Sequence, residues 1–426
     1  MGKVICVILG GGKGERLFPL TKTRAKPAVP FGCRYRIVDI PISNSIHAGI
    51  KQIFIITQFN SDSLNNHVSS AYRFDTFSRG FIRIMAAKQS FDSFTGWFLG
   101  TADAVRKNLN SFLLTNPDYI MILSGDQLYR MDLWQFFEEH IESKAEISIA
   151  STIVTRKAAS SFGILSIDKN GIINNFKEKP GVDEDISEFQ LPPEKAVESR
   201  DGIKKEYLAS MGIYIFNADT LKKCLDSDFS DFGKELIPDS LNKYRVKGFI
   251  YDGYWEDIGT IRSFYEANLN LASSYPYFNL YDEFRPIYSS SVELPPSKIN
   301  TCTFRNTLTG EGSIITDAFI SNSLVGIRTI IDSGASLENV YCMGADYYET
   351  DEQKKENSIK EIPNIGIGAG SIIKDAIVDK NVRIGRSCRI GVDNIERKEG
   401  DYINYYIREG LIVIGKDAIL NDGTVI

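Results

Sequence analysis

The stretch VICVIL (residues 4–9), followed by GGGKGERLFPL (residues 10–20), decides the fold of the first part of this chain of 426 residues. A short apolar run that ends in consecutive glycines is typical of a buried strand leading into a tight turn. Glycine has no Cβ, so a ligand can closely approach the backbone N–H groups of Gly10 and Gly11. Backbone donors close to a cation such as Arg16 suit a polyphosphate, and we therefore predict a triphosphate-binding loop.

Positive charge is concentrated at this end of the chain. Residues 1–36 contain eight Lys or Arg and one acid, which gives +7, whereas the whole chain has a formal net charge of −6. Such a concentration favours an anionic small ligand. The spacing is not that of a P-loop, because Lys13 precedes Gly14 and Glu15, and the third glycine of the dinucleotide fingerprint is missing. A glycine-rich turn on a basic surface is the alternative.

The composition indicates a soluble globular protein of more than one domain. Hydrophobic residues make up 43% of the chain and charged residues 24%, and the length exceeds that of most single domains. We expect no membrane span, no leader peptide and a cytoplasmic location. Six cysteines without any C-x-x-C pair predict neither a zinc site nor a disulfide framework. The acidic balance argues against a nucleic-acid partner.

Apolar strands alternate with amphipathic helices over residues 1–270. We expect an α/β domain with a doubly wound, mostly parallel, Rossmann-like sheet and helices on both faces. A linker rich in Pro, Ser and aromatic residues is predicted at 271–296, before a second domain at 297–426. The predicted strands are 4–9, 52–57, 119–123, 147–153 and 211–216, and the predicted helix is 132–142.

A six-residue apolar period marks the second domain and predicts a parallel β-helix of about six coils. The charged residues 346–362 interrupt the period, and we expect them to loop out. An irregular β-sandwich is the alternative. The periodic positions are Ile314 and Ile320; Val325, Ile331, Leu337 and Met343; and Ile372, Val378, Ile384 and Ile390.

Motifs along nearly the whole chain resemble those of sugar-nucleotide pyrophosphorylases, and most closely the plant and cyanobacterial type of the ADP-glucose pyrophosphorylase family. The resemblance implies a nucleotidyltransferase domain followed by a left-handed parallel β-helix. The chain departs from the family pattern at three positions. Glu15 replaces a small hydroxyl residue, Thr23 replaces a Lys, and Gln127 replaces a His that is common at this position. The matching motifs are GGGKGERLFPLT, RAKPAVP, DIPISNS, TQFNS, GTADAV, SGDQLYRMD, FKEKP, LASMGIY, DGYWEDIGT and MGADYYET.

The resemblance implies a glucose-1-phosphate adenylyltransferase that makes ADP-glucose and pyrophosphate from ATP and glucose 1-phosphate, for glycogen or starch synthesis. Such phosphoryl chemistry requires positioning and charge cancellation. We assign Arg16 and Lys26 to the leaving pyrophosphate, and the resemblance pairs Asp126 with Asp257 as ligands of Mg²⁺. Taken singly, these residues could also be surface charges or turn caps.

The resemblance also implies the substrate contacts. Lys179 corresponds to the clamp on the phosphate of glucose 1-phosphate, although a K-E-K run before proline is often an exposed turn. Gln58 can donate and accept hydrogen bonds and could therefore read a base edge. The sugar hydroxyls are assigned to Gly163, Glu178 and Ser210. The remaining substrate-binding residues are Gly10, Gly11, Phe98, Gly100, Thr101 and Gly125.

Assembly and regulation are likewise implied by the family. We expect a homotetramer, because an apolar β-helix beside a catalytic domain needs covering. Phosphorylated metabolites are the expected effectors, with Lys380, Lys416 and Arg36 as the cations that bind them. Thr23 removes a cation often found near that site. Surface charge is the alternative for all three cations.

Three rival interpretations remain open at this point. Gln127 could mark a regulatory subunit whose catalytic site is weak, although Arg16, Lys26, Asp126 and Lys179 are present. The chain could be a non-enzymatic assembly protein. It could also be a sugar-nucleotide synthase that uses UTP or dTTP.

Overall fold

The computed structural model describes residues 2–10, 12, 14–75, 77–87, 97–198, 202–291, 293–392 and 397–426. The chain forms two compact units. Unit 1 comprises Met1–Gly12, Ile40–Ser61 and Val68–Trp255, and unit 2 comprises Lys13–Asp39, Asp62–His67 and Glu256–Ile426. The glycine-rich loop is therefore divided between the units. The domain boundaries expected from the sequence remain a prediction.

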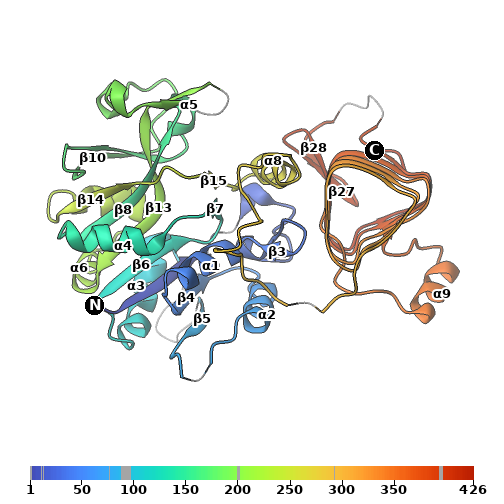
Figure 1. Ribbon diagram of the computed structural model, residues 1–426, viewed down its shortest axis with the longest axis horizontal. Coiled ribbons are helices and arrows are strands. Elements are labelled where there is room, and N and C mark those ends of the chain that lie inside the picture. The colour runs from blue at the N-terminus through green and yellow to red at the C-terminus, as the bar shows by residue number, and fades with distance from the viewer. Residues whose placement is uncertain are drawn as a thin grey trace. The chain divides into compact units, whose positions relative to one another are not determined.

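Unit 1 holds the large sheet and most of the helices (Figure 1). Its strands are β1 (Val4–Leu9), β4 (Gln52–Thr57), β5 (Phe81–Ala86), β6 (Tyr119–Ser124), β7 (Gln127–Tyr129), β8 (Ile147–Val154), β9 (Gly163–Ile167), β10 (Ile173–Glu178), β11 (Val197–Glu198), β12 (Lys204–Lys205), β13 (Tyr207–Asn217) and β14 (Val246–Ile250). Its helices are α3 (Thr101–Leu113), α4 (Leu133–Glu142), α5 (Arg156–Ala159), α6 (Ala218–Cys224), α7 (Ile237–Ser240), the 3-10 turns η3 (Ser187–Phe189) and η4 (Pro193–Lys195), and the π-helical turn η5 (Phe232–Leu236).

Three elements share their residues between the units: α1 (Asp39–His47), α2 (Asp62–Ala71) and β15 (Trp255–Asp257). Unit 2 contains the 3-10 turns η1 (Glu15–Leu17) and η2 (Lys26–Ala28), the strands β2 (Pro30–Phe31) and β3 (Tyr35–Arg36), and helix α8 (Ile261–Leu271). Its remaining strands and helix α9 (Asp351–Ile359) belong to the β-helix.

Among the described residues, the unit 1 sheet has nine strands, and every strand predicted from the sequence is present in it. Strands β5, β4, β1 and β6 run parallel in that order. β13 is antiparallel to β6, β8 and β9, whereas β14 is parallel to β8. The predicted α/β fold is confirmed, and the sheet becomes mixed from β13 onward.

Helices cover both faces of this sheet. Side chains such as Ile5 and Val7 point into a core shared with α3 and α6. The alternate side chains are equally buried, because α1 and α4 lie over the second face. Ser45 of α1 hydrogen-bonds to Cys6 Sγ at 3.3 Å, and Phe136 of α4 packs on Phe249 of β14. Burial on both sides explains the continuous apolar runs of these strands.

The second domain forms a β-helix whose three-sided coils are seen nearly end-on in Figure 1. One face is a sheet of six strands, β16 (Lys298–Asn300), β18 (Ile314–Thr316), β20 (Ile330–Ile331), β22 (Gly366–Ile367), β24 (Arg383–Ile384) and β29 (Ile419–Leu420). The other faces contain β17 (Thr303–Thr309), β19 (Phe319–Val325), β21 (Ser336–Cys342), β23 (Ile372–Val378), β25 (Arg389–Ile390), β26 (Gly400–Asp401), β27 (Tyr405–Arg408) and β28 (Leu411–Ile414).

The corners of the coils are made by residues with left-handed backbone. Asn306, Asn322, Asn339 and Asp375 have φ between 45° and 55° and bend β17, β19, β21 and β23 in the middle. Asn and Asp tolerate this conformation better than other residues with a Cβ. Their side chains form a ladder, in which Asn322 Nδ2 donates to Asn339 Oδ1 at 2.6 Å and Asn339 Nδ2 donates to Asp375 Oδ1 at 2.9 Å.

Two of the predicted stacking positions are wrong by one residue. Ile314 is 38% exposed and Ile372 is half-buried, whereas Ile315 and Ile373 are fully buried in the core. The cause is the length of a coil, since aligned residues such as Ile299, Ile315 and Ile331 are 16 apart. The interruption at 346–362 contains helix α9, which the charge pattern alone did not predict.

Candidate active site

Three loops predicted to meet the substrates begin at one edge of the unit 1 sheet. Gly10 follows β1, Gly125 and Asp126 follow β6, and Gln58 follows β4. Because these strands are parallel neighbours, their carboxyl ends lie at the same edge. The glycine-rich loop and the SGDQ segment therefore open at the same edge of the sheet.

The backbone of the glycine-rich loop is only partly available to a ligand. Gly10 N donates to Ile56 O at 2.8 Å, so Gly10 offers close approach but no spare N–H group. Gly14 has a φ of 67°, and a Cβ at this position would lie 2.8 Å from Thr21 Cγ2. Glycine is therefore needed here for both space and conformation. Gly11, which was predicted to bind substrate, and the neighbouring Lys13 lie outside the described residues.

Within unit 2, Arg16 and Lys26 lie on either side of Asp257. Arg16 Nη2 is 3.7 Å from Asp257 Oδ2, and Lys26 Nζ is 4.0 Å from Asp257 Oδ1. A Cβ at Gly259 would lie 2.9 Å from Arg16 Nη2 and 3.0 Å from Asp257 Oδ1, so this glycine leaves room for the group. The Arg16 side chain is 66% exposed, whereas the Lys26 side chain is 10% exposed. Two cations and a carboxylate from distant segments are thus brought together.

Asp126 lies at the end of β6 in unit 1. Its carboxylate accepts a hydrogen bond from Ser124 Oγ. Gly125 N donates to Leu9 O at 3.0 Å, which fixes the turn against β1. The carboxylate is half-buried and can offer oxygen ligands to a hard cation.

Gln58 is held by the segment that precedes α3. Gln58 Oε1 accepts a hydrogen bond from Phe98 N at 2.8 Å. The neighbouring rings of Phe59 and Trp97 stack, with centroids 4.6 Å apart. The amide Nε2 of Gln58 is therefore the end of the side chain that can donate to a base edge.

The start of α3 is bound to the turn before η5. A Cβ at Gly100 would lie 2.4 Å from Ser230 O, so only glycine fits. The Thr101 hydroxyl donates to Asp231 Oδ2 at 3.1 Å and accepts from Phe232 N at 3.0 Å. These bonds give Thr101 a structural task, and its contact with a substrate remains a prediction.

Glu178 is enclosed by two glycines in unit 1. Cβ atoms at Gly163 and Gly233 would lie 2.6 Å and 2.7 Å from Glu178 Oε2. Burial raises the pKa of Glu178, and nearby Lys179 partly offsets this effect. Lys179 Nζ lies 3.6 Å from Glu178 Oε1. Lys179 has a φ of 45°, a strained backbone conformation that tends to occur at functional sites.

Ser210 lies at an irregularity of β13. The register of β13 against β8 shifts between Ser210 and Ile213. At the same point β13 changes neighbour, since its first part pairs with β9 and its last part with β6. Gly212 N donates to Ser210 Oγ at 3.2 Å. A bulge of this kind re-aims side chains and is often found at active sites.

Two of the predicted effector-binding lysines in unit 2 share one carboxylate. Lys380 Nζ lies 2.6 Å from Asp346 Oδ1, and Lys416 Nζ lies 3.5 Å from Asp346 Oδ2. Burial raises the pKa of Asp346, but the two ammonium groups outweigh it and hold this pKa well below its usual range. Burial also lowers the pKa of Lys380, and Asp346 counteracts that shift.

Two arginines of unit 2, Arg24 and Arg36, act electrostatically on Lys380. Arg24 Nη1 donates to Asp379 Oδ1 at 2.8 Å, while its buried Nη2 has no hydrogen-bond partner among the described residues. Arg36 Nη1 donates to Ser63 Oγ at 2.6 Å and to Ala28 O at 2.9 Å. Burial and the charge of Arg24 lower the pKa of Arg36. An anion would relieve this concentration of positive charge.

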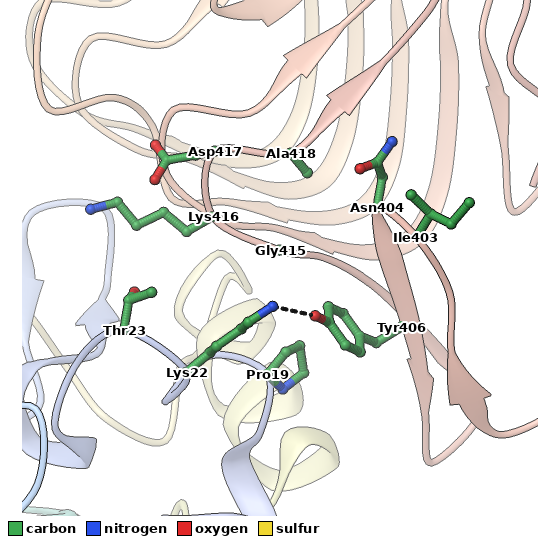
Figure 2. A pocket seen from close by; sticks show the side chains of 10 residues that line it. All are labelled: Pro19, Lys22, Thr23, Ile403, Asn404, Tyr406, Gly415, Lys416, Asp417 and Ala418. Atoms are coloured by element: carbon green, nitrogen blue, oxygen red, sulfur yellow. Dashed lines mark hydrogen bonds between the residues drawn. The ribbon is translucent and has the colours of Figure 1, made fainter.

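A pocket of about 180 Å³ adjoins Lys416 within unit 2 (Figure 2). Thr23 lies in its wall. The resemblance places Thr23 near an effector site, which remains a prediction. Lys22 Nζ donates to Tyr406 OH at 3.1 Å across the pocket. The lining residues are Pro19, Lys22, Thr23, Ile403, Asn404, Tyr406, Gly415, Lys416, Asp417 and Ala418.

Comparison with known families gives two matches that together cover most of the chain. The Nucleotidyl transferase family matches residues 5–274, and the GLGC left-handed parallel beta-helix domain matches residues 293–425. The combination of these two is the signature of one family. The chain belongs to the ADP-glucose pyrophosphorylase family. The predicted left-handed hand of the β-helix is confirmed, and the family is one of nucleotidyltransferases.

The structure places beside the predicted site residues several that sequence reasoning missed. Asp231 and Gly233 lie next to Glu178, and Trp255 precedes Asp257 by two residues. Asp231 caps the π-helical turn η5 and Gly233 lies within it, and such turns are frequent at functional sites, but the sequence alone does not indicate this turn. Within the described part of the chain, the helices are too short or too polar to cross a bilayer.

Proposed function

We propose that the chain is a glucose-1-phosphate adenylyltransferase, which transfers the adenylyl group of ATP to glucose 1-phosphate. A phosphate oxygen of the sugar phosphate attacks the α-phosphorus, and pyrophosphate leaves. The observation that carries the proposal is the group formed by Arg16, Lys26 and Asp257. Members of this family act on nucleoside triphosphates and sugar phosphates, which supports the reaction class.

Arg16 and Lys26 neutralise the charge that develops on the leaving pyrophosphate. The guanidinium can hold two phosphate oxygens at once, and the ammonium group supplies a compact charge. Lys26 is buried to 9% exposure, so its charge acts where water screens it poorly. Stabilisation of this kind is often the largest part of catalysis in phosphoryl transfer.

Asp126 and Asp257 are the proposed ligands of Mg²⁺. Both offer hard carboxylate oxygens, which fit this ion. Among the described residues, no group of three or more His, Cys, Asp or Glu side chains could hold a metal by itself. Mg²⁺ is commonly held by one or two carboxylates, and substrate phosphate oxygens and waters complete its coordination. When bound, Mg²⁺ neutralises phosphate charge.

The sugar phosphate is assigned to the residues around Glu178. Lys179 binds its phosphate, and the Glu178 carboxylate accepts hydrogen bonds from sugar hydroxyls. Gly163 gives close access beside Glu178, because any Cβ at this position would lie only 2.6 Å from Glu178 Oε2. Ser210 contributes from the bulge of β13. Gln58 Nε2 is assigned to the base, because its Oε1 already accepts from Phe98 N.

A regulatory anion site completes the proposal. Lys380, Lys416 and Arg36 bind a phosphorylated metabolite, and Thr23 shapes the adjoining pocket. The support is the grouping of buried cations: burial, together with the charge of neighbouring arginines, lowers the pKa of both Lys380 and Arg36. We further propose a homotetramer, in line with the expectation from the sequence.

The proposal is tested by measuring pyrophosphate release from ATP, UTP, dTTP and GTP with glucose 1-phosphate and Mg²⁺. We expect ATP to give the highest kcat/KM, with ADP-glucose as the product. A preference for UTP or dTTP contradicts the adenylyl assignment. An absence of turnover with all four nucleotides, with and without sugar phosphate effectors, contradicts the proposal and leaves the regulatory subunit and the non-enzymatic assembly protein, which a nucleotide-binding measurement distinguishes.

A further inference from the structure

Gln127 immediately follows Asp126 and is buried, with 7% exposure. Its amide makes two hydrogen bonds to separate segments of unit 1. Nε2 donates to Met211 O at 2.8 Å, and Oε1 accepts from Trp255 Nε1 at 3.1 Å. One partner is an acceptor and the other a donor, so the two bonds fix the orientation of the amide.

The first partner belongs to the bulge of β13. Met211 lies inside the register shift between Ser210 and Ile213, where a carbonyl is taken out of the regular ladder. Gln127 supplies a donor to this carbonyl. A Cβ at Gly212 would lie 3.8 Å from Gln127 Nε2, so the amide packs closely along the bulge. Gln127 therefore stabilises the backbone that aims Ser210.

The second partner leads to the segment of the sugar-phosphate clamp. The Trp255 ring packs edge-on against Phe162, with centroids 4.9 Å apart. Phe162 O accepts a hydrogen bond from Lys179 N at 3.1 Å. This bond and ring contact support the left-handed backbone of Lys179. The Gln127 amide thus connects to Lys179 through Trp255 and Phe162.

We propose that Gln127 is a positioning residue for the nucleotidyl transfer, and that it holds Ser210 and Trp255 in register with Asp126. The inference rests on the proposed function. A neutral histidine could make the same pair of bonds, because one ring nitrogen donates and the other accepts. Glutamine makes them without titrating. Its presence is therefore consistent with an active chain.

The experiment compares the full-length wild-type protein with Gln127→His and Gln127→Leu. Leucine removes both bonds and leaves the Met211 carbonyl and the Trp255 N–H without this partner. We expect kcat/KM for glucose 1-phosphate to fall by about 10- to 100-fold in the leucine variant. The KM for ATP should change less than twofold. Gln135→Leu, which changes an exposed glutamine of α4, is the matched control and should behave as wild type.

The histidine variant keeps the inference testable if the leucine variant does not fold. At pH 8 it should retain at least about half of the wild-type kcat/KM, since neutral imidazole satisfies both partners. The expected result is therefore that histidine rescues the activity that leucine loses, because it restores both hydrogen bonds.

Two results overturn the inference in distinguishable ways. If the wild type is active and Gln127→His keeps the wild-type melting temperature but loses as much kcat/KM as Gln127→Leu, the pair of hydrogen bonds has no positioning role. Equal kcat/KM of Gln127→Leu and wild type leads to the same conclusion. If the wild type forms no sugar nucleotide from any triphosphate, the proposed function fails, and this inference fails with it.

Discussion

Replacing Arg16 by alanine separates a catalytic role from a structural one. The side chain is 66% exposed, and its nearest charge partner, Asp257, is 3.7 Å away. An exposed ion pair of this kind contributes about 0–1 kcal/mol to stability. Two charge-assisted hydrogen bonds to pyrophosphate at about 1.5 kcal/mol each would instead stabilise the transition state by roughly 3 kcal/mol. We therefore expect kcat to fall about 100-fold while the melting temperature hardly changes.

The assay measures pyrophosphate release at saturating ATP and glucose 1-phosphate, together with thermal unfolding. Arg34→Ala is the matched control, because Arg34 is also an exposed cation of unit 2, paired with Glu311 at 2.8 Å. The control should retain full turnover. A kcat for Arg16→Ala within twofold of wild type would refute the role of Arg16, and a large fall in melting temperature would show that the residue acts through the fold.

Three further predictions concern the sugar-phosphate and effector sites. Lys179→Ala should raise the KM for glucose 1-phosphate at least tenfold more than the KM for ATP, which is about the effect of losing one charge-assisted hydrogen bond. The control Lys177→Ala should not, and an equal rise in both KM values would contradict the binding of the sugar phosphate by Lys179. Burial raises the pKa of Glu178, so its carboxylate is protonated at a higher pH than that of an exposed Glu. The KM for glucose 1-phosphate should therefore rise as the pH falls through this pKa, and a KM that does not depend on pH, or that changes in the same way as the KM for ATP, contradicts the role of Glu178. Asp346→Asn removes the carboxylate that pairs with Lys380 and Lys416 and should lower the concentration of sugar phosphate needed for half-activation by about fivefold. The control Glu338→Gln, which changes an exposed carboxylate paired with a lysine, should not, and an unchanged or higher concentration in Asp346→Asn disproves competition between Asp346 and the effector.

The sequence predicted the sheet well because its strands are short apolar runs bounded by turn signals. It could not predict the direction of β13. A strand buried on both faces has the same continuous apolar sequence pattern whether its neighbours are parallel or antiparallel. The bulge at Ser210 was hidden for a similar reason, since a register shift depends on the partner strand and not on the residues alone.

The β-helix was predicted from its six-residue period, but two of the predicted core positions, Ile314 and Ile372, were wrong by one residue. A strict six-residue step accumulates an error when a coil takes 16 or 17 residues, as the pairing of Phe304, Ile320 and Leu337 shows. The corner residues carry the missing information. Asn or Asp with left-handed backbone marks where one face ends and the next begins.

The candidate site was predictable where its residues share a motif and unpredictable where they meet only in space. Arg16 and Lys26 stand out because cations follow glycines within one short segment. The contacts of Gln127 join residues 84 and 128 positions away, and no local pattern indicates them. The same holds for Asp346, whose two lysine partners lie in other coils.

The division of the glycine-rich loop has a consequence for control of the reaction. Arg16 and Lys26 belong to the same compact unit as Lys380 and Lys416. Phe18, two residues beyond Arg16, packs edge-on against Tyr406 with ring centroids 5.3 Å apart, and Tyr406 lines the pocket beside Lys416. An occupant of that pocket would therefore restrict the motion of the segment that we propose binds the leaving pyrophosphate. By thermodynamic linkage, bound pyrophosphate would then increase the affinity for the effector by the same factor by which the bound effector increases the affinity for pyrophosphate.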